Sequence, residues 1–478
     1  MSSESISILW FRQDLRLEDN PALCAAVKSG RFYPIYILDD DSAEDWAMGA
    51  ASRVWLNNSL QKLDQSLDGK LSLYHGKAEE VLPELVKRLG VKSVYWNRCY
   101  EPWRINRDRN IKEILTDVDA AVKSFNGSLL WEPWEVLKKD GTPYKVFTPY
   151  FRACRAATLP AKPVPVPEGI DAIKDNGSLN LAELPLLPKQ KSWVEQMCSY
   201  WSMGEKAAHL ALDEFISNGL SRYKKGRDFP SERSVSRMSP HLHFGEVSPN
   251  YVLNVILEQS AGENRDHFYS ELAWREFSYY LLYHFPKLPD QNFQPKFDGF
   301  EWFGSDTDLK AWQRGMTGVP IVDAGMRELW QTGYMHNRVR MIVASFLTKN
   351  LGVHWREGAR WFWDTLVDAD LASNSASWQW VAGSGADAAP YFRIFNPVTQ
   401  SKRFDGDADY ICTYVPELAK LPVRYIFAPW EAPEEALDAT GFKLGRDYPN
   451  VITSLKSSRE KALLTYKNLG KNLGEGLG

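Results

Sequence analysis

The chain has 478 residues, of which 44% are hydrophobic, and its formal net charge at pH 7 is −4. This length allows two or three domains around a large buried core. A net charge this close to zero excludes binding to nucleic acid through overall positive charge, so any such contact needs a local basic face.

The sequence also restricts the compartment and the redox chemistry. No apolar run is as long as the roughly 18 residues of a membrane helix, and the N-terminal residues MSSESISILWF lack the basic flank and long apolar stretch of a secretory signal. We therefore expect a cytoplasmic protein. The 5 cysteines show no C-x-x-C spacing, which argues against a disulfide framework, a zinc site and a thioredoxin-like motif. We expect reduced thiols and no metal site.

The N-terminal part predicts an α/β fold. Segments of helical period alternate with β-rich apolar runs at Ile6–Phe11, Tyr33–Leu38, Leu71–Tyr74 and Val94–Trp96. The clearest helical segment is Ser52–Leu67, where the leucines on one face are Leu56, Leu60, Leu63 and Leu67. This alternation predicts a Rossmann-like parallel sheet covered by helices through about residue 130. No G-x-G-x-x-G follows the first strand, so the usual dinucleotide phosphate site is not expected.

The run Trp96–Asp108, WNRCYEPWRINRD, follows the last of these predicted strands. Open α/β sheets bind ligands at the carboxyl ends of their strands, so this run is a candidate ligand pocket. A polar loop that caps a helix is an equally good interpretation.

Regular periodicity stops beyond Pro149, and Pro160–Pro188 is rich in proline, lysine and small polar residues. This composition predicts a long surface linker. From Trp193 onward the patterns are helical, which predicts an all-α domain. We place the α/β domain at residues 1–132, the linker at 133–200 and the helical domain at 201–478.

The segment Arg222–Ser239, RYKKGRDFPSERSVSRMS, is strongly basic. A solvated charged loop would explain this bias. Phosphate binding is the alternative, because the turn that ends at Ser239 and Pro240 offers hydroxyls and backbone N–H groups at a helix start, which suits a pyrophosphate.

The segment Phe268–Phe277, FYSELAWREF, places an acid near a large aromatic ring. In a helix, Glu271, Trp274 and Arg275 share a face at three- and four-residue spacing. The alternative is a core Trp274, with Glu271 paired to Arg275 on the surface.

In Gly333–Leu347, GYMHNRVRMIVASFL, the residues that fall within one helical turn are Asn337, Arg338 and Met341. They could line the floor of a cavity, while Arg340 could reach a carboxylate such as Asp368. We expect a buried imidazole at His336 instead of a catalytic base.

The stretch Trp361–Pro397 reads WFWDTLVDADLASNSASWQWVAGSGADAAPYFRIFNP and combines tryptophans, aspartates and the Asn374 amide. Small residues between the aromatic ones would let a flat ligand approach the backbone while Asp and Asn address its polar edge. A tryptophan-rich helical hairpin with exposed acids is the alternative. The total of 19 tryptophans indicates either a heavily aromatic core or the use of indoles as redox relays.

Several of these strings resemble the photolyase and cryptochrome family. DADLASN, WQW and DAAPYFRIFNP resemble its flavin-binding core, ELAWREF resembles its substrate-side helix, and WFRQDLRLEDNPAL at Trp10–Leu23 resembles its opening signature. The chain is most similar to the photolyases that act on cyclobutane pyrimidine dimers. The resemblance implies an α/β antenna domain and an all-α FAD-binding domain, joined by a long linker.

The resemblance implies a site for FAD, reduced in the active state. The residues that it assigns to cofactor binding are Tyr223, Val235, Ser236, Arg237, Met238, Ser239, Phe268, Asp368, Ala369, Asp370 and Asn374. Relatives usually have Thr where Val235 stands, so one hydroxyl contact is missing. Asn374 matches the neutral amide beside flavin N5, and Arg340 would offset negative charge nearby. The tryptophans that match the family's electron relay from the surface to the flavin are Trp302, Trp355 and Trp378.

The resemblance also implies double-stranded DNA with pyrimidine dimers as the partner. Glu271 would donate or share a proton with a pyrimidine carbonyl, and Trp274 and Trp380 would stack on a flipped-out lesion. The residues assigned to lesion and DNA contacts are Arg227, Glu271, Trp274, Arg275, Asn337, Arg338, Met341, Trp380 and Gln400. Among the site residues, those with a catalytic role are Glu271, Asn337, Arg340 and Asn374.

The resulting hypothesis is light-dependent repair of cyclobutane pyrimidine dimers by electron transfer from excited reduced FAD. A cryptochrome-type blue-light photoreceptor is the main alternative; Glu271, Asn337, Met341 and Asn374 together argue against it, as does the lack of a long disordered tail after Gly441–Tyr448. Met341 argues against 6-4 photoproduct repair and, less decisively, against a single-strand-specific relative.

The resemblance allows a second, antenna chromophore in the Trp96–Asp108 pocket, either methenyltetrahydrofolate or a deazaflavin. Folate-binding members often carry Asn-Glu where this chain has Trp103 and Arg104. We expect a monomer.

Overall fold

The computed structural model describes residues 6–157, 161–387 and 392–472. The chain forms two compact units, each made of several segments of the sequence. The first unit comprises Met1–Ser221, Ser236–Pro286 and Val367–Ala372, and the second comprises Arg222–Val235, Lys287–Leu366 and Ser373–Gly478. No described helix is long and apolar enough to cross a membrane. The domain limits at residues 132 and 200 stay predictions.

The first unit contains a 5-stranded parallel sheet with the strand order β3-β2-β1-β4-β5. Its strands are β1 (Ser7–Phe11), β2 (Phe32–Leu38), β3 (Ser72–His75), β4 (Ser93–Asn97) and β5 (Ala121–Phe125). The predicted parallel sheet is therefore confirmed, and four of its strands lie at the predicted apolar runs. The edge strand β5 was not predicted, because AVKSF is exposed or only partly buried and has no apolar run to mark it.

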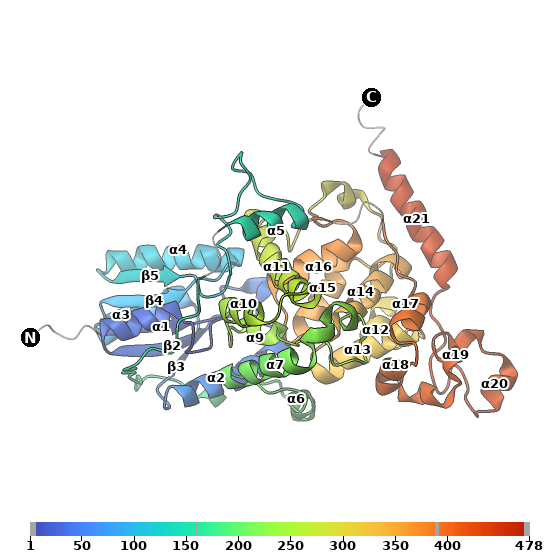
Figure 1. The fold of residues 1–478 in the computed structure, drawn as a ribbon, viewed down its shortest axis with the longest axis horizontal. Helices are drawn as coiled ribbons and strands as arrows, with labels where there is room; N and C mark the ends of the chain where they lie inside the picture. The colour runs from blue at the N-terminus through green and yellow to red at the C-terminus, as the bar shows by residue number, and fades with distance from the viewer. Residues whose placement is uncertain (1–5, 158–160, 388–391, 473–478) are drawn as a thin grey trace, which may run out of the picture. The chain divides into compact units, whose positions relative to one another are not determined.

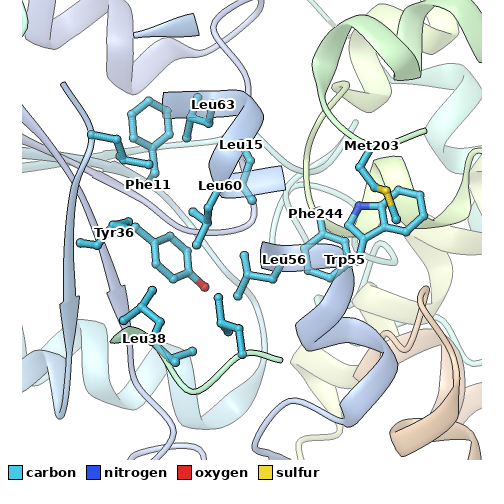
Figure 2. Packing of buried hydrophobic residues seen from close by; sticks show 14 of the residues in the cluster. Phe11, Leu15, Tyr36, Leu38, Trp55, Leu56, Leu60, Leu63, Met203 and Phe244 are labelled. Carbon is cyan, nitrogen blue, oxygen red and sulfur yellow. The ribbon is translucent and has the colours of Figure 1, made fainter. Parts of the chain in front are cut away.

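The two faces of this sheet pack against different helices (Figure 1). Leu9 and Phe11 point to the face covered by α1 (Pro21–Ser29) and α2 (Ala50–Ser66), whereas Ile8 and Trp10 point to the face covered by α3 (Ala78–Leu89) and α4 (Pro102–Asp117). Alternate residues of a strand point to opposite faces, which explains why both sets are buried. Figure 2 shows the first face, where the leucines of α2 meet Phe11 and Tyr36, and Trp55 meets Phe244 and Met203.

The predicted linker is attached to the sheet edge in its described part. Asp171 O accepts a hydrogen bond from Phe32 N at 3.2 Å, and Leu179 N donates to Leu73 O at 2.9 Å. Asp175 accepts two hydrogen bonds from the Arg88 guanidinium, at 2.6 and 3.0 Å. The linker therefore covers β2 and β3 without forming a strand of its own.

The first unit contains further helices, and two helices are shared with the second unit. The further helices of the first unit are η1 (Glu44–Trp46), α5 (Phe147–Ala156), η2 (Leu181–Glu183), α6 (Lys191–Cys198), α7 (Glu205–Asn218), α9 (Ser239–His243), α10 (Pro249–Glu258) and α11 (Glu263–His284). The two that cross from one unit to the other are η3 (Leu220–Arg222) and α16 (Leu371–Ala382).

The described part of the second unit is helical, which confirms the predicted all-α half. Its helices are α8 (Tyr223–Gly226), η4 (Pro295–Gly299), α12 (Asp306–Gln313), α13 (Pro320–Thr332), α14 (Asn337–Ser345), η5 (Phe346–Asn350), α15 (Trp355–Thr365), α17 (Pro397–Phe404), α18 (Asp409–Tyr414), η6 (Pro416–Lys420), α19 (Val423–Ile426), η7 (Pro429–Glu431), α20 (Glu434–Asp438) and α21 (Leu455–Asn472). The turn η5 is a π-helix that carries the buried Lys349, whose Nζ donates to Ala382 O at the end of α16. Burial lowers the pKa of Lys349 well below its ordinary value.

Candidate functional site

Helix α11 of the first unit carries the predicted acid and aromatic ring. The side chain of Glu271 is partly exposed, and its Oε1 lies 3.8 Å from Nε2 of His267. Trp274 is partly buried, and the ring of Phe147 from α5 stacks on it with the centroids 3.8 Å apart and the planes at 11°. One face of the Trp274 indole is therefore covered by the chain itself.

Arg275 does not form the surface pair with Glu271 that the sequence allowed as an alternative. Its Nη1 donates to Oε1 of the neighbouring Glu276 at 2.8 Å, and its guanidinium lies 4.8 Å from the Tyr279 ring centroid. Burial alone would lower the pKa of Arg275, but the charges of Tyr279, Glu276 and Asp370 leave it raised. The predicted contact of Arg275 with DNA stays a prediction.

Glu276 was not predicted as part of a network. Its Oε2 accepts the backbone N–H of Leu130 at 2.7 Å, so α11 is tied to the chain that follows the sheet. Burial raises the pKa of Glu276 to about 7, against the opposing effect of Arg275. No sequence pattern marks it, because its partner Leu130 lies far away in the chain.

The predicted phosphate-side turn and the aspartate string come together in the first unit. Ser239, the first residue of α9, donates its hydroxyl to Asp368 Oδ2 at 2.6 Å. Asp370 accepts a hydrogen bond from the Tyr279 hydroxyl and lies 3.5 Å from Nδ1 of His243. Arg237 has a φ of +53°, which bends the backbone just before α9. Hydrogen-bond donors suited to a phosphate and the two carboxylates thus lie close together in the first unit.

Two further predicted cofactor residues of the first unit are buried. Phe268 is packed against Phe215 with the ring centroids 4.8 Å apart, and Ala369 stands between the two aspartates of the string. Neither side chain has a polar group, so packing is the contribution that their chemistry allows.

In the second unit, Tyr223 is buried and the Arg227 guanidinium lies 5.6 Å from its ring centroid. Val235 follows Ser234, whose hydroxyl would lie 2.3 Å from a Cβ at Gly226. The chain therefore folds closely at Gly226. Most basic side chains of the segment are nevertheless exposed, namely Arg222, Lys224, Lys225 and Arg233, as expected for the solvated charged loop that the sequence allowed as an alternative.

Helix α14 begins at Asn337. The Asn337 side chain is exposed, and Nη1 of Arg338 lies 3.9 Å from the Met341 sulfur. Arg338 also donates to Asp228 at 2.6 Å. Asn337, Arg338 and Met341 thus lie on one turn.

His336 precedes this helix and caps it, because its Nδ1 accepts the Arg338 N–H at 3.2 Å. Burial, followed by the charge of Arg340, lowers the pKa of His336 to about 3. A buried imidazole with so low a pKa fits the predicted packing role. Arg340 itself donates to Met335 O at 2.7 Å, and its predicted pairing with Asp368 stays a prediction.

The predicted relay tryptophans lie in the second unit. Trp378 on α16 is buried, with its ring centroid 5.0 Å from that of Phe362 and 6.2 Å from that of Trp312. On the same helix, Asn374 donates to Ala359 O at 3.0 Å. This bond fixes the orientation of the amide, since its oxygen then points away from Ala359.

Trp302 and Trp355 are connected by a residue that the sequence did not single out. The ring of His354 lies 4.7 Å from that of Trp302 and 5.7 Å from that of Trp355, between centroids. Only the helix start at Trp355 could have drawn attention to His354, as a capping residue.

The end of α16 is held by Gln379, which was also not predicted. Its amide donates to Leu288 O at 2.7 Å and Gln291 O at 2.8 Å, and its oxygen accepts Phe293 N–H at 2.7 Å. This side chain is fully buried and fixes its neighbour Trp380 in the chain.

The remaining predicted residues follow α16. Nε1 of Trp380 donates to Asp387 O at 3.2 Å. Gln400 on α17 has a buried side-chain oxygen without a hydrogen-bond partner in the described structure. Residues 388–391 of the DAAPYFRIFNP string lie outside the described residues.

The carboxyl ends of β1 and β4 hold a dense polar and aromatic cluster. Arg12 lies 2.5 Å from Asp108 and stacks over Trp10 at 4.7 Å from the ring centroid. In this cluster, the buried polar atoms without a hydrogen-bond partner in the described structure include Nε1 of Trp10, Nε1 of Trp96, Oδ1 of Asn97 and Oε2 of Glu101. The predicted loop thus has buried polar groups left over for a ligand, although it also starts helix α4.

Comparisons with known proteins agree with this arrangement. Residues 7–168 match the family described as DNA photolyase, and residues 268–468 match the family described as the FAD binding domain of DNA photolyase. The deoxyribodipyrimidine photo-lyase of Agrobacterium fabrum is 47% identical over 97% of this chain and 98% of its own length. Cryptochrome-1 of Arabidopsis thaliana is 37% identical over 96% of this chain and 70% of its own.

The solved structures include a bacterial class III photolyase from Agrobacterium tumefaciens. Its TM-score against this chain is 0.94 at 46% sequence identity, and the match covers 98% of this chain and 99% of that one. Because relatives above 30% identity extend along almost the whole sequence, the chain belongs to the photolyase and cryptochrome family and carries its FAD-binding domain.

Proposed function

We propose that the protein is a deoxyribodipyrimidine photo-lyase, which uses light to split cyclobutane pyrimidine dimers in DNA. The proposal rests on the full-length similarity to photolyases together with one structural observation, the exposed Asn337 one turn from Met341 at the start of α14. A neutral amide and a thioether can hold a pyrimidine pair without adding charge. Neither group can donate the proton that histidines would supply in the repair of 6-4 photoproducts.

The residues assembled in the first unit fit FAD. The hydroxyl and backbone N–H groups around Ser239 suit a pyrophosphate, with Ser236, Arg237 and Met238 in the same turn, and the aspartates of the DADL string suit the polar edge of a flavin. The proposed set also includes Phe268, Asp368, Ala369 and Asp370 of the first unit, and Tyr223, Val235 and Asn374 of the second. Bound and reduced, FAD supplies the photoexcited electron that the dimer needs.

The protein's own residues orient the lesion and control protons. Glu271 donates or shares a proton with a pyrimidine carbonyl, and its partly exposed carboxyl is accessible for this role. The indoles of Trp274 and Trp380 stack on the two bases. Asn374 offers an amide, which has no acidic proton, beside flavin N5, and Arg340 offsets negative charge there.

The protein binds DNA through contacts with the sugar-phosphate backbone of the DNA. Arg227, Arg338 and Gln400 contact phosphates flanking the lesion, and Arg275 is a further proposed DNA contact. Such contacts give affinity that is independent of base sequence. Duplex DNA with pyrimidine dimers is the partner.

The antenna chromophore, methenyltetrahydrofolate or a deazaflavin, is proposed for the cluster at the carboxyl ends of β1 and β4. Its support is the set of buried, unpartnered indole and carboxyl atoms there. Extraction of the purified protein with acid, followed by mass spectrometry, would identify the pigment. Monomeric state and cytoplasmic location stay predictions.

Repair assays on defined oligonucleotides test the function. Illuminated, reduced protein should split thymine dimers back into thymines and leave 6-4 photoproducts unchanged, and the reverse result would reject the proposal. Glu271→Ala should slow dimer repair by roughly a hundredfold, the lower end of the range typical of general acid catalysis, with unchanged flavin content. Glu263→Ala, in the first turn of the same helix, is the matched control and should repair normally.

A further inference from the structure

A histidine ring lies between two tryptophans of the proposed electron relay. The His354 ring centroid is 4.7 Å from that of Trp302 and 5.7 Å from that of Trp355. In the part of the chain that the structure describes, Trp302 and Trp355 make no ring contact with each other. The aromatic route from one indole to the other therefore passes through His354.

The backbone holds these rings together. Phe303 N and Gly304 N both donate to Gly352 O, at 3.0 and 2.9 Å, so the segment that carries Trp302 is fastened beside His354. Gly352 has a φ of +65°, and a Cβ there would lie 2.3 Å from Cε2 of Phe303. Only glycine permits this close approach, so the contact between the rings follows from the fold.

His354 is held in a neutral form. Its Nδ1 accepts the Arg356 N–H at 3.1 Å and caps α15, so the proton of the neutral ring is on Nε2. Burial, followed by the charges of Arg356 and Arg360, lowers the pKa of His354 to about 4. In the proposed relay each indole carries a positive charge for a short time. A neutral His354 ring adds no further positive charge beside them.

Trp355 is arranged to keep its N–H proton. The indole is 1% exposed, and its Nε1 donates to Oδ1 of Asn292 at 3.0 Å. Asn292 in turn donates to Asp298 at 2.7 Å. Because an amide oxygen does not take up a proton at neutral pH, an oxidised Trp355 remains a radical cation that an electron can refill.

We propose that His354 is a positioning residue of the relay, whose ring connects Trp302 to Trp355. This inference rests on the proposed function, in which oxidised FAD is reduced by light through Trp378. After Trp355 has lost one electron along that route, Trp302 gives one electron to it: Trp355 returns to a neutral indole and Trp302 becomes the radical cation. Trp302 then releases its N–H proton to water, and a thiol in solution restores it with one electron and one proton.

The test distinguishes the effect of losing the His354 ring from the effect of losing the helix cap that its Nδ1 provides. His354→Asn keeps a side-chain acceptor that caps helices well but removes the ring. It should lower the quantum yield of flavin photoreduction at least about threefold and lengthen the lifetime of the Trp355 radical cation in transient absorption. Flavin content and dimer repair by chemically reduced enzyme should not change. His354→Phe keeps a ring and should restore most of the yield.

Two controls distinguish the possible failures. Trp302→Phe sets the yield expected without an outer donor. If His354→Asn photoreduces like the unmodified protein while Trp302→Phe does not, the bridging role is rejected. If Trp302→Phe and Trp378→Phe also photoreduce normally, the relay assignment in the proposed function fails instead. Should His354→Asn lose flavin, His354→Ser, also a capping residue without a ring, takes its place.

Discussion

Glu276 shows how burial can give a single residue an effect on stability that depends on pH. Its pKa is raised to about 7 from an ordinary 4.5, because burial disfavours the charged form more than Arg275 favours it. Between these two pH values the folded chain holds a proton on this carboxyl that the unfolded chain has released. Stability contributed by this group is therefore complete below pH 4.5 and is lost as the pH rises through 7.

Glu276→Gln should remove this pH dependence, because an amide does not titrate. Between pH 5 and 7.5 the unmodified protein should lose roughly 2 kcal/mol more stability than the variant, which corresponds to a difference of about 2 °C in melting temperature for a chain of this length. Calorimetry at constant ionic strength measures this difference. Glu214→Gln, an exposed acid on α7, should follow the unmodified protein. Parallel profiles for Glu276→Gln and the unmodified protein would contradict the raised pKa.

At the scale of elements, the contact between α15 and α16 depends on one glycine. A Cβ at Gly358 would lie 2.1 Å from Cη2 of Trp378 and 2.7 Å from Cδ2 of Leu347. The first of these atoms belongs to a large buried ring that cannot move without disturbing its neighbours. The position of the Trp378 indole is therefore set by a residue of the adjacent helix.

Gly358→Ala should destabilise the protein by about 1–3 kcal/mol through this overlap, even though alanine favours a helix over glycine by about 1 kcal/mol. Photoreduction should also slow, since Trp378 must shift. Denaturant unfolding and photoreduction yields measure the two effects. Gly406→Ala, where a Cβ would have only an ordinary contact of 3.5 Å with Lys402 O, should change neither. A variant Gly358→Ala that is more stable than the unmodified protein would disprove the tight contact.

Elements with a regular apolar pattern could be predicted from the sequence, and irregular ones could not. Strands β1 to β4 and helix α2 follow their apolar spacing, whereas the edge strand β5 has little to bury. The π-turn η5 inserts an extra residue per turn into what reads as a continuous helix. Its buried Lys349 contradicts the usual exposure of lysine, so a sequence pattern would place it on the surface.

At the scale of the whole molecule, DNA binding has to overcome a net charge of −4. Association should weaken with rising salt for damaged and undamaged duplexes alike, because phosphate contacts release counterions. Arg227→Ala should reduce the slope of log K against log salt by about 1 for both duplexes. Fluorescence anisotropy over a salt series measures the slopes. Arg424→Ala, outside the proposed contacts, should leave them unchanged, and a salt-independent affinity would contradict binding through phosphates.

Only part of the site could be predicted from spacing. The placement of Asn337, Arg338 and Met341 within one helical turn followed from helical period, but the start of α14 at Asn337 was not predicted. The roles of these residues came from family resemblance. The hydrogen bond between Ser239 and Asp368 joins positions 129 residues apart, which no local pattern reveals. Arg275 pairs with the adjacent Glu276 because burial favours the closest pairing of opposite charges. The three- and four-residue spacing used to predict ion pairs on exposed helix surfaces does not apply to such a buried pair.

The stack of Phe147 on Trp274 restricts how the parts of this chain can be exchanged. Phe147 precedes the helical half in the chain, yet its ring supports the indole proposed to hold a damaged base. A chimaera that takes its light-collecting module from another protein, with the junction placed after α5, would bring a foreign residue to this spot. Engineers who graft such modules should therefore cut upstream of Phe147, so that the host keeps both members of the stacked pair.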